Sequence, residues 1–338
     1  MKVAIVILNW NGAHFLEKFL PALIAHTTHP DYSLWVADNG STDRSLQLLS
    51  EQFPQINTLV FDKNYGFAGG YNKALKQIEA EYYVLLNSDV EVTPHWLEPM
   101  IAYLDANPNV AACQPKIMSY DLRMVFEHAG AAGGFIDYLG YPLCRGRVLA
   151  TMETDYGQYD NITDIFWATG ACLFIRSSVF HEYGGLDDDF FAHMEEIDLC
   201  WRIRSRGKRI VCVPESVVYH VGGGTLHKEH PRKTYLNFRN NLLLLYKNLP
   251  NNQLRFVLYQ RFFLDYIAAL QLLLTGKPKN ALAVLKARRD YRRMRPSFRA
   301  RRKENLEKTV LTHVPEIIPH SIIYNYYLRK KRRFSDLV

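Results

Sequence analysis

The chain has 338 residues, of which 48% are hydrophobic and 13% aromatic, so it can build one large domain with an appendage, or two domains. Its net charge of +7 is unevenly divided, because residues 231–338 carry 24 Lys and Arg against only 6 Asp and Glu. No apolar run reaches the roughly 18 residues of a membrane-spanning helix, and Asn9 interrupts the apolar start too early for a signal peptide.

Short apolar strands alternate with helices in the first 90 residues. We expect strands at residues 3–8, 34–37, 58–61 and 82–86, with helices at residues 15–25, 45–52 and about 66–78 between them. This alternation predicts an α/β fold with an open, mostly parallel sheet covered by helices on both faces.

A polar cluster follows each of these strands. The clusters are NWNG at 9–12, DNGSTD at 38–43, NYGFAGG at 64–70 and NSDVE at 87–91. Each alone could be an ordinary turn or helix cap. Ligands bind at the carboxyl ends of strands in open α/β sheets, so their shared location favours one binding site. The glycine loop matches neither the dinucleotide fingerprint nor the Walker loop, which argues against hydride transfer and a P-loop enzyme.

The middle of the chain, residues 110–165, is irregular and rich in glycine, as expected of loops that form substrate walls. Strands are expected near residues 171–175, 210–213 and 217–220. His220 ends the last of these and precedes three glycines, which makes it a candidate metal ligand, although a lone histidine is more often structural. The five cysteines form no CxxC pair, which favours structural thiols in a reducing compartment.

An acidic stretch, FAHMEEIDLCWR at 191–202, stands out because Glu195, Glu196 and Asp198 lie among apolar and aromatic residues. Ile197 and Trp201 are four residues apart and share a helix face. Glu196 begins this helix, where the dipole favours a carboxylate that can point into a cleft. We interpret it as a general base; the alternative is an ordinary acidic helix start.

The C-terminal part is helical and basic. Residues 254–275 form a mostly apolar helix with a narrow polar stripe and several aromatic residues, and residues 286–303 contain ten Lys and Arg against one acid. This combination suits binding in the plane of an anionic membrane. The alternative is a helix packed on the catalytic domain. Nucleic acid is not expected as a partner, because the aromatic residues lie apart from the basic ones.

These motifs together resemble family 2 glycosyltransferases of the GT-A fold, particularly the rhamnosyltransferase-like bacterial members. The motifs are NWNG, DNGSTD, NYGFAGGYN, LLNSDVE, ATGACLFIR, GGLDDDFFAHMEEIDLCWR and VYHVGGG, in that order. The resemblance implies a GT-A catalytic domain at residues 1–245. Residues 246–338 are then a helical, basic, membrane-associating region.

The resemblance also implies roles for individual residues. The donor-side positions are Leu8, Asn9, Asn11, Asp38, Asn64, Asn72, Asn87 and Ser88. Asp89 and His220 are the implied ligands of Mg²⁺ or Mn²⁺, although Asn87 stands where the family's DXD motif has its first Asp. Glu195 and Glu196 match the motif that carries the base in second place, with Asp198 beside them. Trp167, Thr169 and Gly170 resemble the acceptor-side wall.

The resulting hypothesis is an inverting, metal-dependent glycosyltransferase. It moves a sugar from a dTDP- or UDP-sugar to a hydroxyl of a lipid-linked glycan in cell-surface polysaccharide synthesis, at the cytoplasmic face of the cell membrane. Two alternatives stay open: a nucleotidyltransferase, for which NWNG supplies no basic phosphate-binding loop, and a non-catalytic membrane protein that binds nucleotide sugars or glycans, which Asn87 favours.

Overall fold

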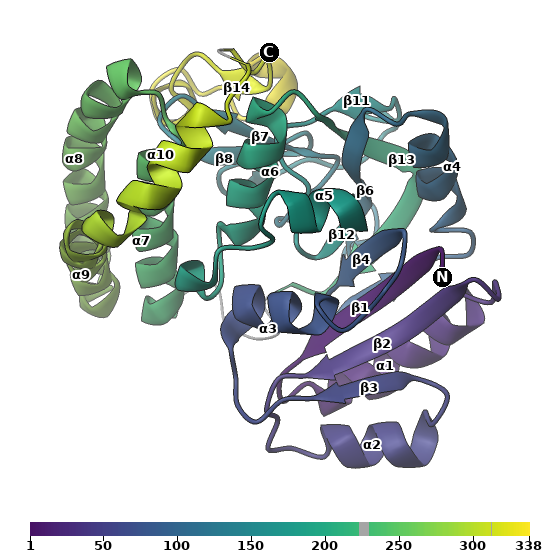
Figure 1. Cartoon of the computed structure of the whole chain (residues 1–338). Coiled ribbons are helices and arrows are strands. Elements are labelled where there is room, and N and C mark those ends of the chain that lie inside the picture. Colours follow the sequence, from purple (N-terminus) through teal and green to yellow (C-terminus); the bar gives the residue numbers. More distant parts are fainter. Residues whose placement is uncertain (223–229, 312) are drawn as a thin grey trace.

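A computed structural model of the chain describes residues 1–222, 230–311 and 313–338 (Figure 1). The last glycines of the VYHVGGG motif therefore lie outside the described residues. The main helices are α1 (Ala13–Ala25), α2 (Ser45–Gln52), α3 (Gly66–Leu75), α4 (Glu98–Ala106), α5 (Ser177–Glu182), α6 (Glu195–Ser205), α7 (Pro231–Asn248), α8 (Asn251–Leu274), α9 (Pro278–Met294), α10 (Arg299–Glu307) and α11 (Ile322–Tyr327).

Within the described residues, nine strands form the central sheet, in the order β11-β13-β6-β12-β4-β1-β2-β3, with β5 paired to β13. The strands are β1 (Val3–Asn9), β2 (Tyr32–Asp38), β3 (Asn57–Val60), β4 (Tyr82–Leu86), β5 (Val90–Val92), β6 (Val110–Ser119), β11 (Thr163–Asp164), β12 (Cys172–Arg176) and β13 (Arg209–His220). The α/β fold, the helix at 45–52 and the strand at 82–86 are as predicted from the sequence.

The sheet is less parallel than expected. Strands β3, β2, β1 and β4 run parallel, whereas β12 lies antiparallel between β4 and β6. The reason is the excursion of the chain between Ser119 and Cys172, which starts and ends at the same edge of the sheet, so that β12 must run back against β6. The two strands predicted at 210–213 and 217–220 are one strand, β13, interrupted by an irregularity between Val213 and Val217.

A smaller sheet joins the C-terminal region to the catalytic part. Within the described residues it has five strands in the order β10-β9-β8-β7-β14: β7 (Gly134–Asp137), β8 (Pro142–Cys144), β9 (Arg147–Val148), β10 (Thr151–Met152) and β14 (Ile317–Ile318). Strand β14 pairs in parallel with β7, and Glu316 forms a buried ion pair with Arg204 of α6. The expected boundary between residues 245 and 246 falls inside α7.

Hydrophobic side chains cover both faces of the central sheet. One cluster packs α1 and α4 against the sheet, and the other packs α3, α6 and α7 against the opposite face and the small sheet. All five cysteines lie within the described residues and are free and buried, as expected of structural thiols.

The polar stripe of α8 is buried only in its middle, whereas Arg255, Gln271 and Thr275 of the same stripe are exposed. Arg261 and Asp265 are 1% and 0% exposed, whereas Phe256, Ile267 and Leu270 are more than half exposed. The guanidinium of Arg261 donates to Asp265 and to the carbonyl of Leu139, so the buried charges are paired. Among the described residues, α8 alone is long and apolar enough to cross a membrane by length and composition, with 22% of its apolar window buried. The expectation that no segment reaches this length is therefore corrected for α8, in which Arg261 and Asp265 interrupt the apolar residues. It lies at the outer edge of the molecule (Figure 1).

Candidate active site

The ends of β1 and β2 are held together by side chains of the first two polar clusters. The amide of Asn9 donates to Asp38 Oδ2 at 3.1 Å, and the backbone N–H of Ser41 donates to Asp38 Oδ1 at 2.9 Å. Asn11 Oδ1 accepts the backbone N–H of Thr42 at 2.7 Å. Asp38 is fully buried and thus organises the loops. Asn9 Oδ1 is buried and has no protein partner among the described residues, which leaves an acceptor for a ligand.

The segment 64–70, the expected glycine loop, lies mostly inside the first part of α3, which begins at Gly66, and two asparagines fix it. Asn39 donates to the carbonyl of Gly66 at 3.0 Å, and Asn64 Oδ1 accepts the N–H of Gly66 at 2.7 Å. Leu8 packs against Gly70, where a Cβ would lie 2.7 Å from the leucine side chain. The predicted positions Leu8 and Asn64 are therefore neighbours at one edge of the sheet, and a side chain at Gly70 would separate them.

Asn72 braces a loop instead of facing a nucleotide. Its amide donates to the carbonyl of Leu186 at 2.7 Å and to Asp188 at 2.5 Å, and its oxygen accepts the N–H of Leu186. Both polar atoms are engaged, so the expected nucleotide contact of Asn72 is corrected to a structural one. It holds the segment that leads into the acidic stretch.

Asp89, His220 and Glu127 form a row at the ends of β4 and β13. His220 Nε2 is 3.1 Å from Asp89 Oδ1, and its Nδ1 is 3.2 Å from Glu127 Oε2. Burial lowers the pKa of His220, but its hydrogen bonds to the two carboxylates outweigh burial and raise that pKa to about 10. Burial also opposes ionisation of Glu127, but His220 outweighs it and lowers the Glu127 pKa to about 2.

Asn87 and Ser88 lie beside this row. The amide of Asn87 is 3.4 Å from His220 Nε2, and Asn87 and Ser88 are half-buried. Ser88 Oγ lies close to Gly12 of the first polar cluster, 3.4 Å from the position that a Cβ would occupy there. The donor-side positions 87 and 88 are thereby placed between β1 and the histidine.

Asp89 and His220 are the candidate ligands of a divalent cation at this edge of the sheet. The described residues contain no cluster of three or more His, Cys, Asp or Glu side chains arranged to hold a metal ion. Asp89 and His220 nevertheless converge as a pair, and a carboxylate on the far ring nitrogen is the usual partner of a metal-bound histidine. Because Mg²⁺ is commonly held by one or two protein ligands plus phosphate oxygens and water, this pair fits such a site.

The loop before α6 is strained. Phe191, His193 and Met194 have φ angles of 66°, 71° and 75°, in the left-handed region that costs a non-glycine residue about 1–3 kcal/mol. Asn240 of α7 holds this loop, because its amide donates to the carbonyls of Phe190, Ala192 and His193 at 2.7–2.9 Å. Strain of this kind, fixed by surrounding structure, is typical of functional sites.

Glu195 and Glu196 follow this loop at the start of α6. Each has one buried carboxylate oxygen, Oε2, without a partner among the described residues. Burial raises the pKa of Glu196 to about 7, and burial together with the Glu196 charge raises the pKa of Glu195 well above its ordinary value. Glu196 is half-buried and Glu195 almost completely buried. A half-buried carboxylate with a pKa near neutrality is suited to proton transfer.

Asp198 belongs to a different environment. It is fully buried and accepts hydrogen bonds from Arg202 at 3.0 Å, Lys247 at 2.7 Å and Asn248 at 2.9 Å. The two cations lower its pKa against the effect of burial. Its expected catalytic role is therefore corrected: Asp198 joins α6 to α7 and has no open side toward a substrate.

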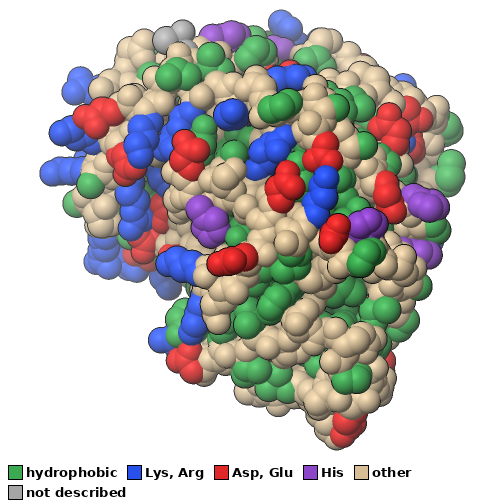
Figure 2. Space-filling view, turned by 45° about the vertical axis from the view of Figure 1, so that its right-hand side comes forward, with side chains coloured by type: hydrophobic (Ala, Val, Ile, Leu, Met, Phe, Trp, Pro, Cys, Tyr) green, Lys and Arg blue, Asp and Glu red, His purple; other side chains and the backbone are tan. Residues whose placement is uncertain are grey.

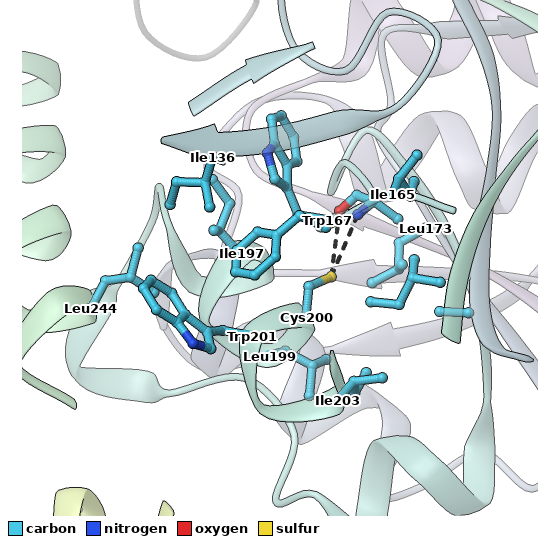
Figure 3. Packing of buried hydrophobic residues seen from close by; sticks show 14 of the residues in the cluster. Ile136, Ile165, Trp167, Leu173, Ile197, Leu199, Cys200, Trp201, Ile203 and Leu244 are labelled. Carbon is cyan, nitrogen blue, oxygen red and sulfur yellow. Dashed lines mark hydrogen bonds between the residues drawn. The ribbon is translucent and has the colours of Figure 1, made fainter. Parts of the chain in front are cut away.

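The expected acceptor-side residues are also buried. The indole N–H of Trp167 donates to the carbonyl of Phe135 at 2.8 Å, and Thr169 accepts the N–H of Ala171 at 3.2 Å. Figure 3 shows Trp167 within the packing of Ile197, Cys200 and Trp201 from α6 against neighbouring apolar residues. Gly170 allows the ring of Phe67 to approach, since a Cβ there would lie 2.9 Å from that ring. These three positions support the site from behind and do not form an exposed wall.

A chain of contacts brings the remaining clusters to one place. The N–H of Asn87 donates to Ala171, next to Gly170, which contacts Phe67 of the glycine loop. The N–H of Phe67 in turn donates to the carbonyl of Phe191 at 2.6 Å. The donor-side loops, the Asp89–His220 pair and the strained loop before Glu195 are therefore contiguous.

Sequence reasoning missed Glu127 and Asn240. Glu127 lies in the irregular middle segment, where no periodicity indicates the direction of a side chain. Asn240 lies in an apolar helix, where a buried asparagine could have been noticed as an unusual polar group that needs partners.

The fold and the carboxylates at its sheet edge define a GT-A type glycosyltransferase. The profile described as Glycosyl transferase family 2 matches residues 4–184, more than half of the chain. The chain belongs to this family and is a glycosyltransferase.

Curated relatives act on glycans. The chain is 27% identical over 242 residues to the N-acetylglucosaminyl-diphospho-decaprenol L-rhamnosyltransferase of Mycobacterium tuberculosis, covering 67% of this chain and 76% of that protein. It is 27% identical to the O-antigen biosynthesis protein RfbC of Myxococcus xanthus, covering 65% of this chain but 17% of that protein.

Solved structures share the fold at low identity. S. aureus TarS 1-349 in complex with UDP-GlcNAc has a TM-score of 0.55 and 16% identity, over 91% of this chain and 89% of that chain. GalNAc-T7 with UDP, GalNAc and Mn²⁺ has a TM-score of 0.52 and 16% identity, over 65% of this chain and 43% of that chain.

Proposed function

We propose that the chain is an inverting, metal-dependent glycosyltransferase that uses Glu196 as its base. The observation that carries this proposal is the buried, unpartnered oxygen of Glu196 at the end of a strained loop that contacts the glycine loop. The donor is a UDP- or dTDP-sugar, and the acceptor hydroxyl belongs to a lipid-linked glycan. The relatives named for O-antigen synthesis and for transfer to a diphospho-decaprenol substrate support these classes.

The nucleotide part of the donor is bound at the ends of β1 and β2. The acceptor oxygen of Asn9 is free to receive a hydrogen bond there, and Asp38 and Asn11 fix the surrounding loops. Leu8 packs directly against Gly70, which keeps the end of β1 close to the start of α3 beside this site.

Asp89 and His220 would hold a Mg²⁺ or Mn²⁺ ion, and such an ion would neutralise the charge that develops on the leaving diphosphate. Glu127 orients the imidazole so that Nε2 faces Asp89. Asn87 contributes a neutral amide where a second carboxylate would add negative charge. The site therefore depends on a single carboxylate ligand from the protein.

Glu196 accepts the proton of the acceptor hydroxyl while that oxygen forms a bond to the anomeric carbon. The bond from this carbon to the diphosphate oxygen breaks in the same displacement, so the configuration at the anomeric carbon is inverted. A pKa near 7 keeps much of the base ionised at neutral pH while leaving it basic enough to take the proton.

The C-terminal region binds the cytoplasmic membrane surface as a peripheral element. The exposed apolar face of α8 includes Phe256, Ile267 and Leu270, and Lys286 and the arginines that follow it add positive charge. Figure 2 shows Lys and Arg side chains gathered along the left-hand side of the face that it draws. Exposed apolar surface next to cations suits an anionic bilayer.

A thermal-shift and turnover experiment tests the proposal. Purified protein is mixed with UDP-sugars, dTDP-sugars, GDP-mannose or NAD, each with and without Mn²⁺, and its melting temperature is measured. We expect a Mn²⁺-dependent rise with UDP- or dTDP-sugars that is lost in Asp89→Ala. Glu196→Gln is expected to keep the shift but to lose sugar transfer by about 10²-fold or more, whereas the exposed control Glu182→Gln keeps both.

Two results would contradict the proposal. Near-normal turnover of Glu196→Gln would exclude this residue as the base. The absence of a shift with every sugar nucleotide would exclude the donor class and favour a different ligand.

A further inference from the structure

A cavity of about 780 Å³ lies between α8, the turn that joins β7 to β8, and the C-terminal segment. It is lined by Tyr138, Leu139, Tyr259, Gln260, Phe263, Leu264, Pro319, His320, Ser321, Tyr324, Asn325, Arg329 and Lys331. We call it the α8–α11 pocket. Among these described lining residues none is acidic, so the pocket combines aromatic surface with positive charge.

The walls of this pocket are fixed by a buried carboxylate. Asp137 Oδ1 accepts the N–H groups of Leu139 and Tyr141, and Oδ2 accepts the N–H of Ile322 at the start of α11. Strand β14, just before α11, also pairs with β7. The C-terminal segment is therefore anchored against the turn, and the pocket is part of the folded structure.

One polar group in the pocket lacks a partner. Gln260 Oε1 accepts the hydroxyl of Tyr138 at 2.8 Å, which fixes the orientation of the amide. Gln260 Nε2 is buried and has no hydrogen-bond partner among the described residues. A buried donor without a partner destabilises the folded protein, so a ligand acceptor at this point would recover free energy.

The pocket borders the exposed apolar face of α8, and two successive contacts link the turn at its wall to the strained loop of the active site. Tyr259 and Phe263 line the pocket and are also 64% and 48% exposed. On the other side, the carbonyl of Gly140 in the turn accepts the amide of Asn241, which also contacts the sulfur of Met194 at 3.9 Å. Met194 directly precedes Glu195.

From these contacts we infer that the α8–α11 pocket binds the phosphate-bearing end of a long-chain lipid acceptor. Arg329, Lys331 and the Gln260 amide bind the phosphate oxygens, and the hydrocarbon chain lies along the exposed face of α8. This inference rests on the proposed function, because it assigns a place to the lipid of the acceptor. A bulk anionic phospholipid is not the occupant, because the open basic surface after residue 286 already serves a charged bilayer.

Vesicle flotation of the full chain tests this inference. Three vesicle types are compared: phosphatidylcholine alone, phosphatidylcholine with phosphatidylglycerol, and phosphatidylcholine with a long-chain polyprenyl diphosphate, the last two matched in surface charge. We expect about tenfold tighter binding to the polyprenyl diphosphate vesicles than to the matched phosphatidylglycerol vesicles, which corresponds to about 1.4 kcal/mol.

Variants distinguish binding in the pocket from general electrostatic attraction to charged vesicles. The double variant Arg329→Gln and Lys331→Gln is expected to lose the tenfold preference, and the control Lys330→Gln and Arg332→Gln, with the same change in charge outside the pocket lining, is expected to retain it. Gln260→Glu keeps the side-chain volume and the acceptor for Tyr138, but places negative charge in the pocket, so it is also expected to abolish the preference. The Gln260→Glu variant tests the pocket independently, because it leaves intact the contact of Lys331 with the C-terminal backbone that the double variant removes.

The outcomes are distinguishable from a failure of the proposed function. Equal binding to both charged vesicle types, or equal loss in the control variant, would overturn the pocket assignment. If the nucleotide-sugar thermal shift persists in that case, the transferase proposal stands and only the lipid site falls. If the shift is also absent, both fall.

Discussion

Glu127 lies 3.2 Å from Nδ1 of His220, on the opposite side of the imidazole from Asp89. The Glu127 carboxylate therefore contacts the histidine ring and is not a contact for the nucleotide. In metal sites, such a partner fixes the ring orientation and its removal typically lowers metal affinity by about 10–100-fold.

We therefore expect Glu127→Gln to weaken Mn²⁺ binding by about 10-fold or more, because glutamine carries no charge to hold the Nδ1 proton. The measurement is a Mn²⁺ titration of the UDP-dependent thermal shift. The control is Glu91→Gln. This variant removes a carboxylate that lies on the nearby strand β5 and is paired with Arg123. An unchanged Mn²⁺ midpoint in Glu127→Gln would show that His220 needs no such support.

The rate of sugar transfer is expected to depend on the ionisation of Glu196. Burial raises the pKa of this carboxyl to about 7, and the base acts only when ionised. The turnover number should therefore rise about tenfold per pH unit at low pH and level off above about pH 7. Rates measured from pH 5 to 9 at saturating donor test this. A plateau that already begins near pH 5 would contradict the raised pKa.

Glu196→Gln is expected to stabilise the protein at alkaline pH while it abolishes transfer. Because the folded-state pKa lies above the ordinary value of 4.5, the folded protein disfavours the ionised form. The resulting loss of stability grows as the pH rises from about 4.5 to 7, and glutamine removes it. We expect a melting temperature at least about 2 °C higher than that of the unchanged protein at pH 8.

The comparison at pH 4 serves as an internal control for this prediction, because both side chains are then neutral. A gain in stability that is the same at pH 4 and pH 8 would mean that packing, and not ionisation, is the cause.

Asn240 is expected to act as a positioning residue for the strained loop. Asn240→Ala leaves the carbonyls of Phe190, Ala192 and His193 without their donor, which should cost about 2 kcal/mol of stability. Because the loop orients Glu196, the turnover number should fall about tenfold or more while the KM for the donor changes little. The control Asn305→Ala removes a hydrogen bond to Asn248 instead. Equal kinetic effects in both variants would assign Asn240 a purely structural role.

The buried charges under α8 are expected to be strongly coupled. Asp265→Ala leaves Arg261 and Arg288 buried without their carboxylate, which should lower the free energy of unfolding by about 3–5 kcal/mol. Chemical denaturation gives this value, and Asp62→Ala, which breaks an exposed pair with Lys73, should change it by less than about 1 kcal/mol. A small effect of Asp265→Ala would mean that water reaches this network.

Local patterns predicted most of the front half of the fold. The apolar run at residues 3–8, the helix at 45–52 and the strand at 82–86 follow from side-chain periodicity and short-range turn signals. The acidic stretch was also recognisable from the sequence, because carboxylates among aromatic residues are unusual in a solvated helix. Such features depend on residues that are close together along the chain, so the sequence alone is enough to predict them.

Other features depend on groups far apart in the chain. Glu127 reaches His220 across 93 positions, and Asp198 finds Lys247 across 49. The sequence predicted Glu195, Glu196 and Asp198 as one acidic group, but helix geometry turns Asp198 into the interior while Glu196 stays half-buried. Neither distinction follows from residue type.

The sequence by itself thus determined the class of the fold, the polar clusters at the ends of its strands and the amphipathic nature of α8. Only the tertiary structure decided that β12 runs antiparallel, that Trp167 belongs to the core, and that Arg261 and Asp265 of the polar stripe of α8 face inward. The physical reason is that hydrophobic periodicity fixes which residues share a face, whereas the direction of that face depends on what the rest of the chain places against it. For α8, paired charges of Arg261, Asp265 and Arg288 occupy the inner side, and the apolar side is left for a partner.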